Sequence, residues 1–347
     1  MNRMLAGFRQ GHTSVLATKG GRLEYRGLPF QFWTFAEGIF IAQAAPGSGY
    51  ERYIGSRLVS IEAVGAEEAL RQVNQTQSID GQNEYLFFGT DILREANYLV
   101  GLHIARSAER VELTLEAPDG ERSTIVVETF PERAPVRLLP TGTSQPPLYL
   151  RQPDQLHWHE ALPEHDALYV QLNGLSDEPG ETLEQYGLRL RAVLEEADPK
   201  NLIIDMRHNA GGSTNLYPEL LRTLVAYSVR TDHKVYVLIG RRTYSAAGNL
   251  ITELEQLADA VFLGEASSEC CVLYGSPATF TLPYSGLRGS ISTRRWSLSR
   301  RPGDRRRELH PDVPVQLTAA DYFAGRDPVM EAAVRLIERG QSDAAHQ

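Results

Sequence analysis

The stretch that decides the fold is LIIDMRHNAGGS, residues 202–213. The run from Asn201 to Asp205 shows no alternation of apolar and polar residues, which is typical of a strand buried on both faces of a sheet. Gly211 and Gly212 follow, and paired glycines after a strand let the backbone turn tightly and direct N–H groups outward. At a helix start such groups hold an anion or a developing oxyanion. Alone, the stretch is equally typical of a plain glycine turn.

Strands and helices alternate on both sides of this stretch. Apolar runs predict strands over 167–172, 235–239 and 260–263, and 3.6-residue periodicity predicts helices over 182–196, 217–228, 246–257 and 328–339. This alternation is typical of an α/β layer built on a largely parallel sheet.

The chain before residue 130 has a different pattern. It predicts short strands over 38–42 and 57–61, a helix over 66–73, and a hairpin whose turn is Asp119-Gly120. Residues 131–153 hold six prolines and are typical of a linker. We therefore expect a β-rich domain over 24–130, a linker over 131–153 and an α/β domain over 154–347.

A second motif is VLIGRRTYSAAG, residues 237–248. It places Ser245 at the end of a predicted strand and the start of a predicted helix. A serine there is placed like a nucleophile on a sharp turn, because the helix N-terminus favours negative charge on its oxygen. The alternative is that Thr243 or Ser245 only caps the helix.

Composition limits the classes of function. The 347 residues suffice for about two domains, and 42% hydrophobic with 23% charged residues indicate a globular chain. A net charge of −9 argues against general nucleic-acid binding. We expect no membrane span and no signal peptide in the chain as given, hence a cytoplasmic location by default, or a periplasmic or extracellular one if the N-terminus is incomplete. Cys270 and Cys271 are adjacent, and since neighbouring cysteines rarely bridge, we expect no disulfide framework.

The order of five segments resembles the tail-specific, or C-terminal-processing, serine peptidase family, which includes the tricorn-type proteases and the interphotoreceptor retinoid-binding repeats. The segments are LIIDMRHNAGGS, VLIGRRTYSAAG, VFLGEAS, HPDVPV and AGRDPVMEAA. The resemblance implies an α/β fold: a crotonase/ClpP-like catalytic core with a β-rich PDZ-like domain over 24–130. It also implies that residues 1–23 are an N-terminal segment belonging to the core.

The same resemblance implies roles for four residues. Ser245 is the nucleophile, and the backbone N–H groups of Gly211, Gly212 and Ala246 hold the oxyanion. The bacterial processing members pair this serine with a lysine in the segment that corresponds to residues 264–275. This segment holds no lysine, and none follows Lys234. Arginine does not give up its proton near neutral pH and cannot substitute.

The tricorn-type branch instead uses a histidine before the PDZ-like domain and an acid before the Pro-Asp motif. The corresponding residues are His12 as general base and Asp304 as orienting acid, with Glu308 as a nearer rival for the acid and His310 as the fallback base. A neutral imidazole can accept the serine proton near pH 7, and a carboxylate can orient the imidazole.

The resulting hypothesis is a serine-type peptidase that acts on a protein or peptide substrate through an acyl-enzyme on Ser245, with His12 in place of lysine and without metal or cofactor. The alternatives are a non-catalytic peptide- or lipid-binding protein on the same scaffold, and an adaptor that acts through residues 24–130. The sequence leaves the substrate and the oligomeric state open.

Overall fold

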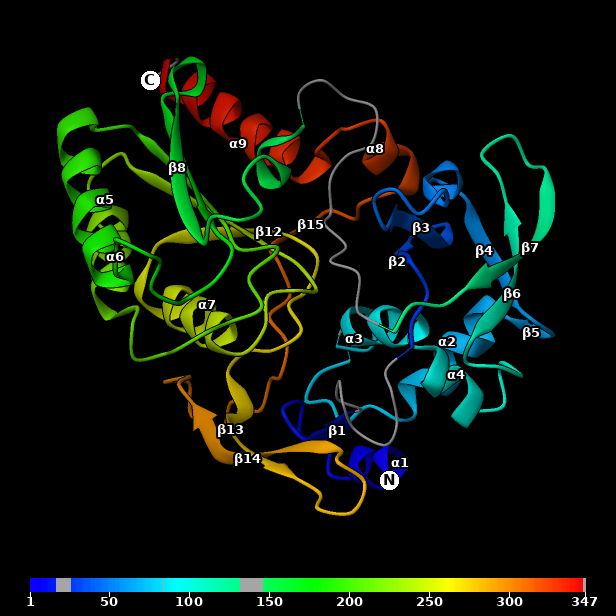
Figure 1. The fold of residues 1–347 in the computed structure, drawn as a ribbon. Coiled ribbons are helices and arrows are strands. Elements are labelled where there is room, and N and C mark those ends of the chain that lie inside the picture. The colour runs from blue at the N-terminus through cyan, green and yellow to red at the C-terminus, as the bar shows by residue number, and fades with distance from the viewer. Residues whose placement is uncertain (17–25, 83, 132–145, 346–347) are drawn as a thin grey trace. The chain divides into compact units, whose positions relative to one another are not determined.

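The computed structural model describes residues 1–16, 26–82, 84–131 and 146–345, which divide into two units (Figure 1). The first unit comprises Met1–Pro146, Tyr274–Arg295 and Leu317–Arg326, and the second comprises Pro147–Leu273, Trp296–Gln316 and Asp327–Gln347. The expected linker over 131–153 contains the boundary at residue 146, and its residues 132–145 lie outside the described ranges.

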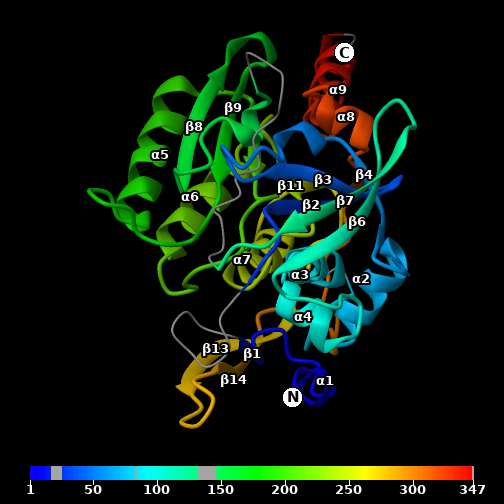
Figure 2. The same ribbon diagram turned by 45° about the vertical axis from the view of Figure 1, so that its right-hand side comes forward.

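The main sheet of the first unit is antiparallel, with the order β2-β3-β4-β6-β7 and with β5 paired to β4. Helices α2, α3 and α4 lie together beside it (Figure 2). The bounds are β2 Phe30–Phe35, β3 Gly38–Ala44, β4 Arg57–Ile61, β5 Val64–Gly65, β6 Arg110–Glu116, β7 Arg122–Glu128, α2 Ala66–Asn74, α3 Glu84–Leu93 and α4 Ala96–Gly101.

The core of this unit forms between the sheet and its helices. Helix α2 buries Ala66, Ala69, Leu70 and Val73, the positions that one face of a helix presents. These side chains join apolar residues of β2, β3, β4 and β6 in one buried cluster. The predicted strands, helix and hairpin are confirmed. The pattern does not indicate helix α3, because its sequence, EYLFFGTDIL, is apolar on nearly all sides and carries little periodicity.

A second, small sheet, most of whose residues belong to the first unit, contains the N-terminal strand β1. Its order is β1-β14-β13, and Ser14 of β1 pairs with Ser290 of β14. The bounds are α1 Asn2–Ala6, β1 Ser14–Leu16, β13 Val272–Thr281, β14 Arg288–Ser297 and α8 Ala319–Phe323. The described part of the expected N-terminal segment, residues 1–16, is grouped with the first unit. The physical reason is this strand pairing, which local sequence does not reveal.

The second unit is built on a sheet of order β15-β12-β11-β10-β9-β8. Only β8 is antiparallel to its neighbour, and the other pairings are parallel. The bounds are β8 His157–Leu162, β9 Ala167–Leu172, β10 Asn201–Asp205, β11 Lys234–Ile239, β12 Ala260–Gly264, β15 Val313–Pro314, α5 Leu183–Ala197, α6 Pro218–Ser228, α7 Ala246–Leu257 and α9 Pro328–Ala345, with single 3-10 turns at Leu148–Leu150 and Pro163–His165. The predicted α/β layer on a largely parallel sheet is confirmed.

The sheet of the second unit is buried on both faces, as the lack of apolar–polar alternation in the β10 sequence predicts. Leu202 and Ile204 pack with α5, α6 and α7 on one face, whereas Ile203 packs with α9 on the other. Figure 2 shows α5 and α6 on one side of the strands and α9 on the other. Among the described residues, none of the helices combines the length and hydropathy that a transmembrane segment needs.

Candidate active site

Ser245 stands at a sharp turn between β11 and α7. Its φ of 57° and ψ of −124° are a conformation that L-residues other than glycine rarely adopt. Ser245 occupies the N-cap position of α7, yet its side chain makes no capping hydrogen bond. The interpretation of Ser245 as a mere cap therefore does not fit the structure. Backbone strain of this kind is concentrated at functional sites, so Ser245 is a candidate nucleophile.

The glycine turn after β10 packs directly against this serine. A β-carbon built on Gly211 would stand 2.6 Å from the β-carbon of Ser245, so only glycine fits there. The two loops are also joined by a hydrogen bond of 3.0 Å from the Tyr244 N–H to the Asn209 carbonyl. The motifs at residues 202–213 and 237–248 therefore form one site, although α6 lies between them in the chain.

The candidate oxyanion donors differ in their contacts. Ala246 begins α7, where backbone N–H groups lack an acceptor within the helix. The Gly211 N–H donates to Oδ1 of Asn209 at 2.9 Å. Gly212 lies against Leu175, whose carbonyl oxygen leaves no room for a side chain. The two glycines and the alanine thus differ in their freedom to donate to a substrate oxygen.

A buried ion cluster anchors the loop that carries these glycines. Arg207 follows β10 and contacts Asp205 and Asp327, with Arg207 Nη1 2.8 Å from Asp327 Oδ1. The ring of Tyr149 lies 4.3 Å from the guanidinium carbon. Because both carboxylates are almost fully buried, each depends on Arg207 for its counter-charge.

Glu269 is a site residue that the sequence reasoning missed. Its carboxylate is completely buried and accepts the Ser245 N–H at 2.8 Å. A single glutamate in the run Ala266-Ser-Ser-Glu-Cys-Cys271 matches no motif, so the sequence carries no signal for it.

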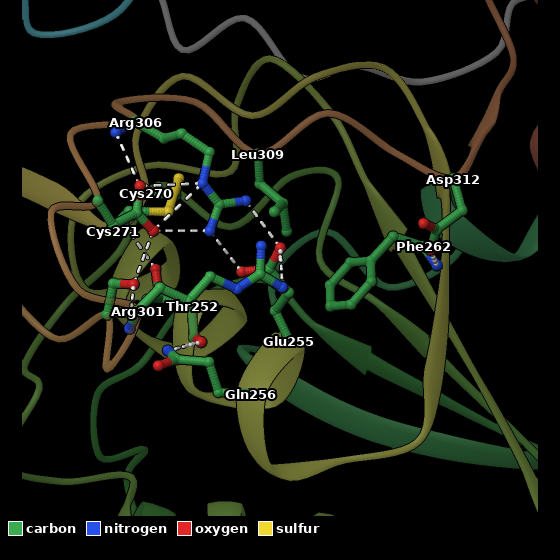
Figure 3. A network of polar contacts seen from close by, with 12 residues as sticks. Thr252, Glu255, Gln256, Phe262, Cys270, Cys271, Arg301, Arg306, Leu309 and Asp312 are labelled. Carbon is green, nitrogen blue, oxygen red and sulfur yellow. Dashed lines mark hydrogen bonds and ion pairs between the residues drawn. A yellow bond between two sulfur atoms is a disulfide. The ribbon is translucent and has the colours of Figure 1, made fainter.

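Cys270 and Cys271 do bridge, although neighbouring cysteines rarely do so. The structure joins them in a disulfide, shown in Figure 3. Cys271 has a φ of 59°, and this turn of the backbone accompanies the bridge between neighbours. Both residues are buried in the core against α7, so the bridge staples no separate part of the fold.

His12 belongs to the first unit, and the residue before it is hydrogen-bonded to the Asp80 side chain. The Gly11 N–H donates to Oδ2 of Asp80 at 2.9 Å, and the His12 carbonyl accepts from Ser290 Oγ at 2.9 Å. Burial lowers the pKa of His12, while a hydrogen bond with the Tyr274 backbone and the charge of Asp80 oppose that change. The imidazole is therefore neutral near pH 7, the state that a general base requires.

Asp304 lies in the second unit, next to the arginine-rich loop. Arg306 donates to its carboxylate at 2.8 Å, and the Ser299 hydroxyl does so at 2.6 Å. These contacts lower the pKa of Asp304 below its usual range. Arg306 also binds Glu255, as Figure 3 shows. Glu255 is ten residues beyond Ser245 on α7, about 15 Å along the axis, so the structure does not bring Asp304 to Ser245.

Glu308 lies between two residues whose backbones bond to the segment that carries Glu269. Its neighbours Arg307 and Leu309 pair with the backbone of Cys270 and Ser267, which flank Glu269. His310 is 76% exposed at its side chain and lies 3.9 Å from Glu308. Within the described residues, no group of three or more His, Cys, Asp or Glu side chains is arranged to hold a metal ion.

Comparison with known proteins defines the fold. No family model and no curated protein matches the chain. Mature CPAF complexed with lactacystin matches with a TM-score of 0.69 and 13% identity over 99% of this chain and 88% of that one. Mature CPAF matches with a TM-score of 0.66 and 13% identity, over 99% of this chain and 87% of that one. A photosystem II D1 C-terminal processing protease matches with a TM-score of 0.43 and 15% identity, over 94% of this chain and 86% of that one. The chain has the fold of the CPAF structures, and the resemblance drawn from its motifs is confirmed at that level.

Proposed function

We propose that this protein is a serine-type peptidase of the tail-specific protease family and that it hydrolyses peptide bonds through an acyl-enzyme on Ser245. The observation that carries the proposal is the strained turn of Ser245 at the start of α7, packed against Gly211. In this proposal the second unit is the crotonase/ClpP-like catalytic core, and the sheet of the first unit with its helices is the PDZ-like domain.

The chemistry assigned to these residues follows the serine-hydrolase sequence of steps. His12 accepts the proton of Ser245 Oγ as the oxygen attacks the scissile carbonyl carbon. Backbone N–H groups of Gly211, Gly212 and Ala246 stabilise the oxyanion. Since Gly211 already donates to Asn209, the other two carry the larger share. The imidazolium then protonates the leaving amine, and water attacks the acyl-enzyme.

The acid that orients His12 is assigned to Glu308 rather than to Asp304. Asp304 is engaged by Arg306 and Ser299 beside the C-terminal half of α7. Glu308 lies on the segment that pairs with the backbone on either side of Glu269. A carboxylate in that role fixes the imidazole tautomer and stabilises the imidazolium.

One observation favours the alternative of a non-catalytic peptide-binding protein. The first unit contains a cavity of about 570 Å³ between the turn that joins β2 to β3 and helix α2. Its lining includes Phe35, Gly38, Ile39 and Leu70 together with Glu37 and Arg71. A mixed apolar and charged lining suits a peptide segment. On this alternative the protein binds peptide and Ser245 has no chemical role.

The experiment that separates the two functions is cleavage of an unfolded protein, β-casein, by the wild type and by Ser245→Ala. The peptidase proposal predicts new N-termini with the wild type and none with the variant. The matched control is Ser228→Ala, which removes a buried hydroxyl bonded to the Val225 carbonyl in α6 and should leave cleavage unchanged. Binding of casein without cleavage by the wild type would favour the alternative.

A further inference from the structure

Glu269 places a buried carboxylate against the backbone of the candidate nucleophile. Its side chain is completely buried, and Oε2 lies 2.8 Å from the Ser245 nitrogen. A buried carboxylate is costly unless hydrogen bonds compensate it, and a bond from N–H to a carboxylate is among the stronger ones. The contact with Ser245 therefore supplies the buried Oε2 of Glu269 with a hydrogen-bond partner.

The segment that carries Glu269 is held in place from two directions. The Ser268 and Glu269 N–H groups both donate to the Thr243 carbonyl, at 3.0 and 3.4 Å. The Ser267 N–H donates to the Leu309 carbonyl at 3.0 Å, and Ser267 Oγ donates to the Glu269 carbonyl at 2.9 Å. The Glu269 backbone is thus fixed to the same loop that ends in Ser245.

Helix α7 approaches this segment closely at its first turn. A β-carbon on Gly248 would stand 2.6 Å from the Glu269 carbonyl oxygen. Because Gly248 has no side chain, the first turn of α7 can pack directly against the backbone of Glu269. The positive end of the helix dipole lies at this turn, which favours a carboxylate there.

The Ser245 conformation needs such a restraint. Its φ of 57° is unfavourable for a residue with a β-carbon, and a conformation of this kind persists only where the surroundings determine it. Thr243 and Tyr244 are tied to the opposite loop through Met206 and Asn209, so the residues before Ser245 are fixed on that side. The Glu269 carboxylate supplies a restraint on Ser245 itself.

We propose that Glu269 is a positioning residue for the reaction: its carboxylate holds the Ser245 N–H and so fixes where the nucleophilic oxygen stands. This inference rests on the proposed function of Ser245. It also implies that the Ser245 N–H is not one of the oxyanion donors, because Glu269 accepts it.

The test is the kinetics of inactivation by a fluorophosphonate probe, with kinact and KI measured separately. In Glu269→Ala the acceptor is lost, and kinact should fall about 10²-fold with KI nearly unchanged, as expected when a reacting group is slightly displaced. In Glu269→Gln an amide oxygen can still accept the N–H, so most of kinact should return. Glu265→Ala is the matched control, since Glu265 pairs with Arg241 in the same segment and should leave kinact near the wild-type value.

A second measurement, amide hydrogen exchange at Ser245, does not depend on activity. The Ser245 amide should exchange about tenfold faster in Glu269→Ala and remain protected in Glu269→Gln, since one hydrogen bond is lost only in the former. Unchanged kinact and unchanged exchange in Glu269→Ala would overturn the positioning role, as would a Glu269→Gln variant as slow as Glu269→Ala. A wild type that takes no label would overturn the proposed function instead, and the exchange rates would still decide the contact.

Discussion

Gly211 lies so close to Ser245 that a β-carbon on the glycine would stand 2.6 Å from the serine β-carbon and 2.9 Å from the Tyr244 carbonyl oxygen. Gly211 also has a φ of 103°, which a side chain would strain. We predict that Gly211→Ala displaces the serine turn and lowers the rate of probe labelling by about 10²-fold or more. The labelling rate and the thermal midpoint of the variant check this.

The matched control for that prediction is Gly180→Ala. Gly180 has a similar positive φ of 95° in the same unit, but no heavy atom beyond its chain neighbours would lie within 4 Å of a β-carbon added there. Its substitution carries the backbone strain without the clash. Equal losses of labelling in both variants would show that strain alone, rather than the contact with Ser245, is responsible.

Arg207 is predicted to be essential for the stability of the second unit. Removing it in Arg207→Ala leaves Asp205 and Asp327 buried without counter-charge, which should cost about 3–5 kcal/mol in the free energy of unfolding. The comparison is Arg222→Ala, whose arginine pairs with Glu219 at 67% exposure and should cost less than about 1 kcal/mol. Denaturant titration measures both, and similar costs would refute the prediction.

The pH dependence of labelling should show whether His12 is the general base. Because burial lowers its pKa from 6.5, the imidazole stays neutral and competent as a base to a lower pH than a free histidine. In the wild type, the decrease of the labelling rate at acid pH is therefore expected to have its midpoint below pH 6.5. The His12→Ala variant should not be labelled at any pH. The charge of Asp80 raises this pKa, so Asp80→Asn should move the midpoint to still lower pH. A midpoint that rises in Asp80→Asn would contradict the assignment.

His208 should make the fold sensitive to acid. Burial, with Arg242 and Arg207 nearby, lowers the pKa of His208 to about 3, whereas a histidine in the unfolded chain titrates near 6.5. Between these values the unfolded state binds a proton that the folded state does not, so stability present above pH 6.5 is lost as pH falls. We expect the thermal midpoint of the wild type to drop more between pH 7 and pH 4 than that of His208→Gln. Equal drops would exclude the histidine as the cause.

The elements that could be predicted from sequence are those with local periodicity or a local motif. The strand from Asn201 to Asp205 and the helix from Ala246 to Leu257 appear at the predicted bounds, because apolar runs and 3.6-residue spacing mark them. The turn at Ser245 is marked by its place between strand and helix. Neither motif alone indicates that Ser245 lies close to Gly211. Only the resemblance, which rests on the order of the five segments, implies that the two motifs form one site.

The features that could not be predicted depend on contacts between distant segments. Glu269 meets Ser245 across 24 residues of sequence, and a lone glutamate has no periodicity to reveal it. Asp304 is engaged by Arg306, and the sequence alone does not show which of the seven arginines in that region binds it. The place of residues 1–16 in the first unit depends on their pairing with β14.

The role of Ser245 as the nucleophile is tested by locating the residue that carries the probe adduct. The wild-type protein is labelled with a fluorophosphonate, digested and sequenced by tandem mass spectrometry, in parallel with Ser245→Ala and His12→Ala. We expect a single adduct on Ser245, and we expect both substitutions to remove it. A folded wild type that carries no adduct, or one on another serine, would contradict this expectation.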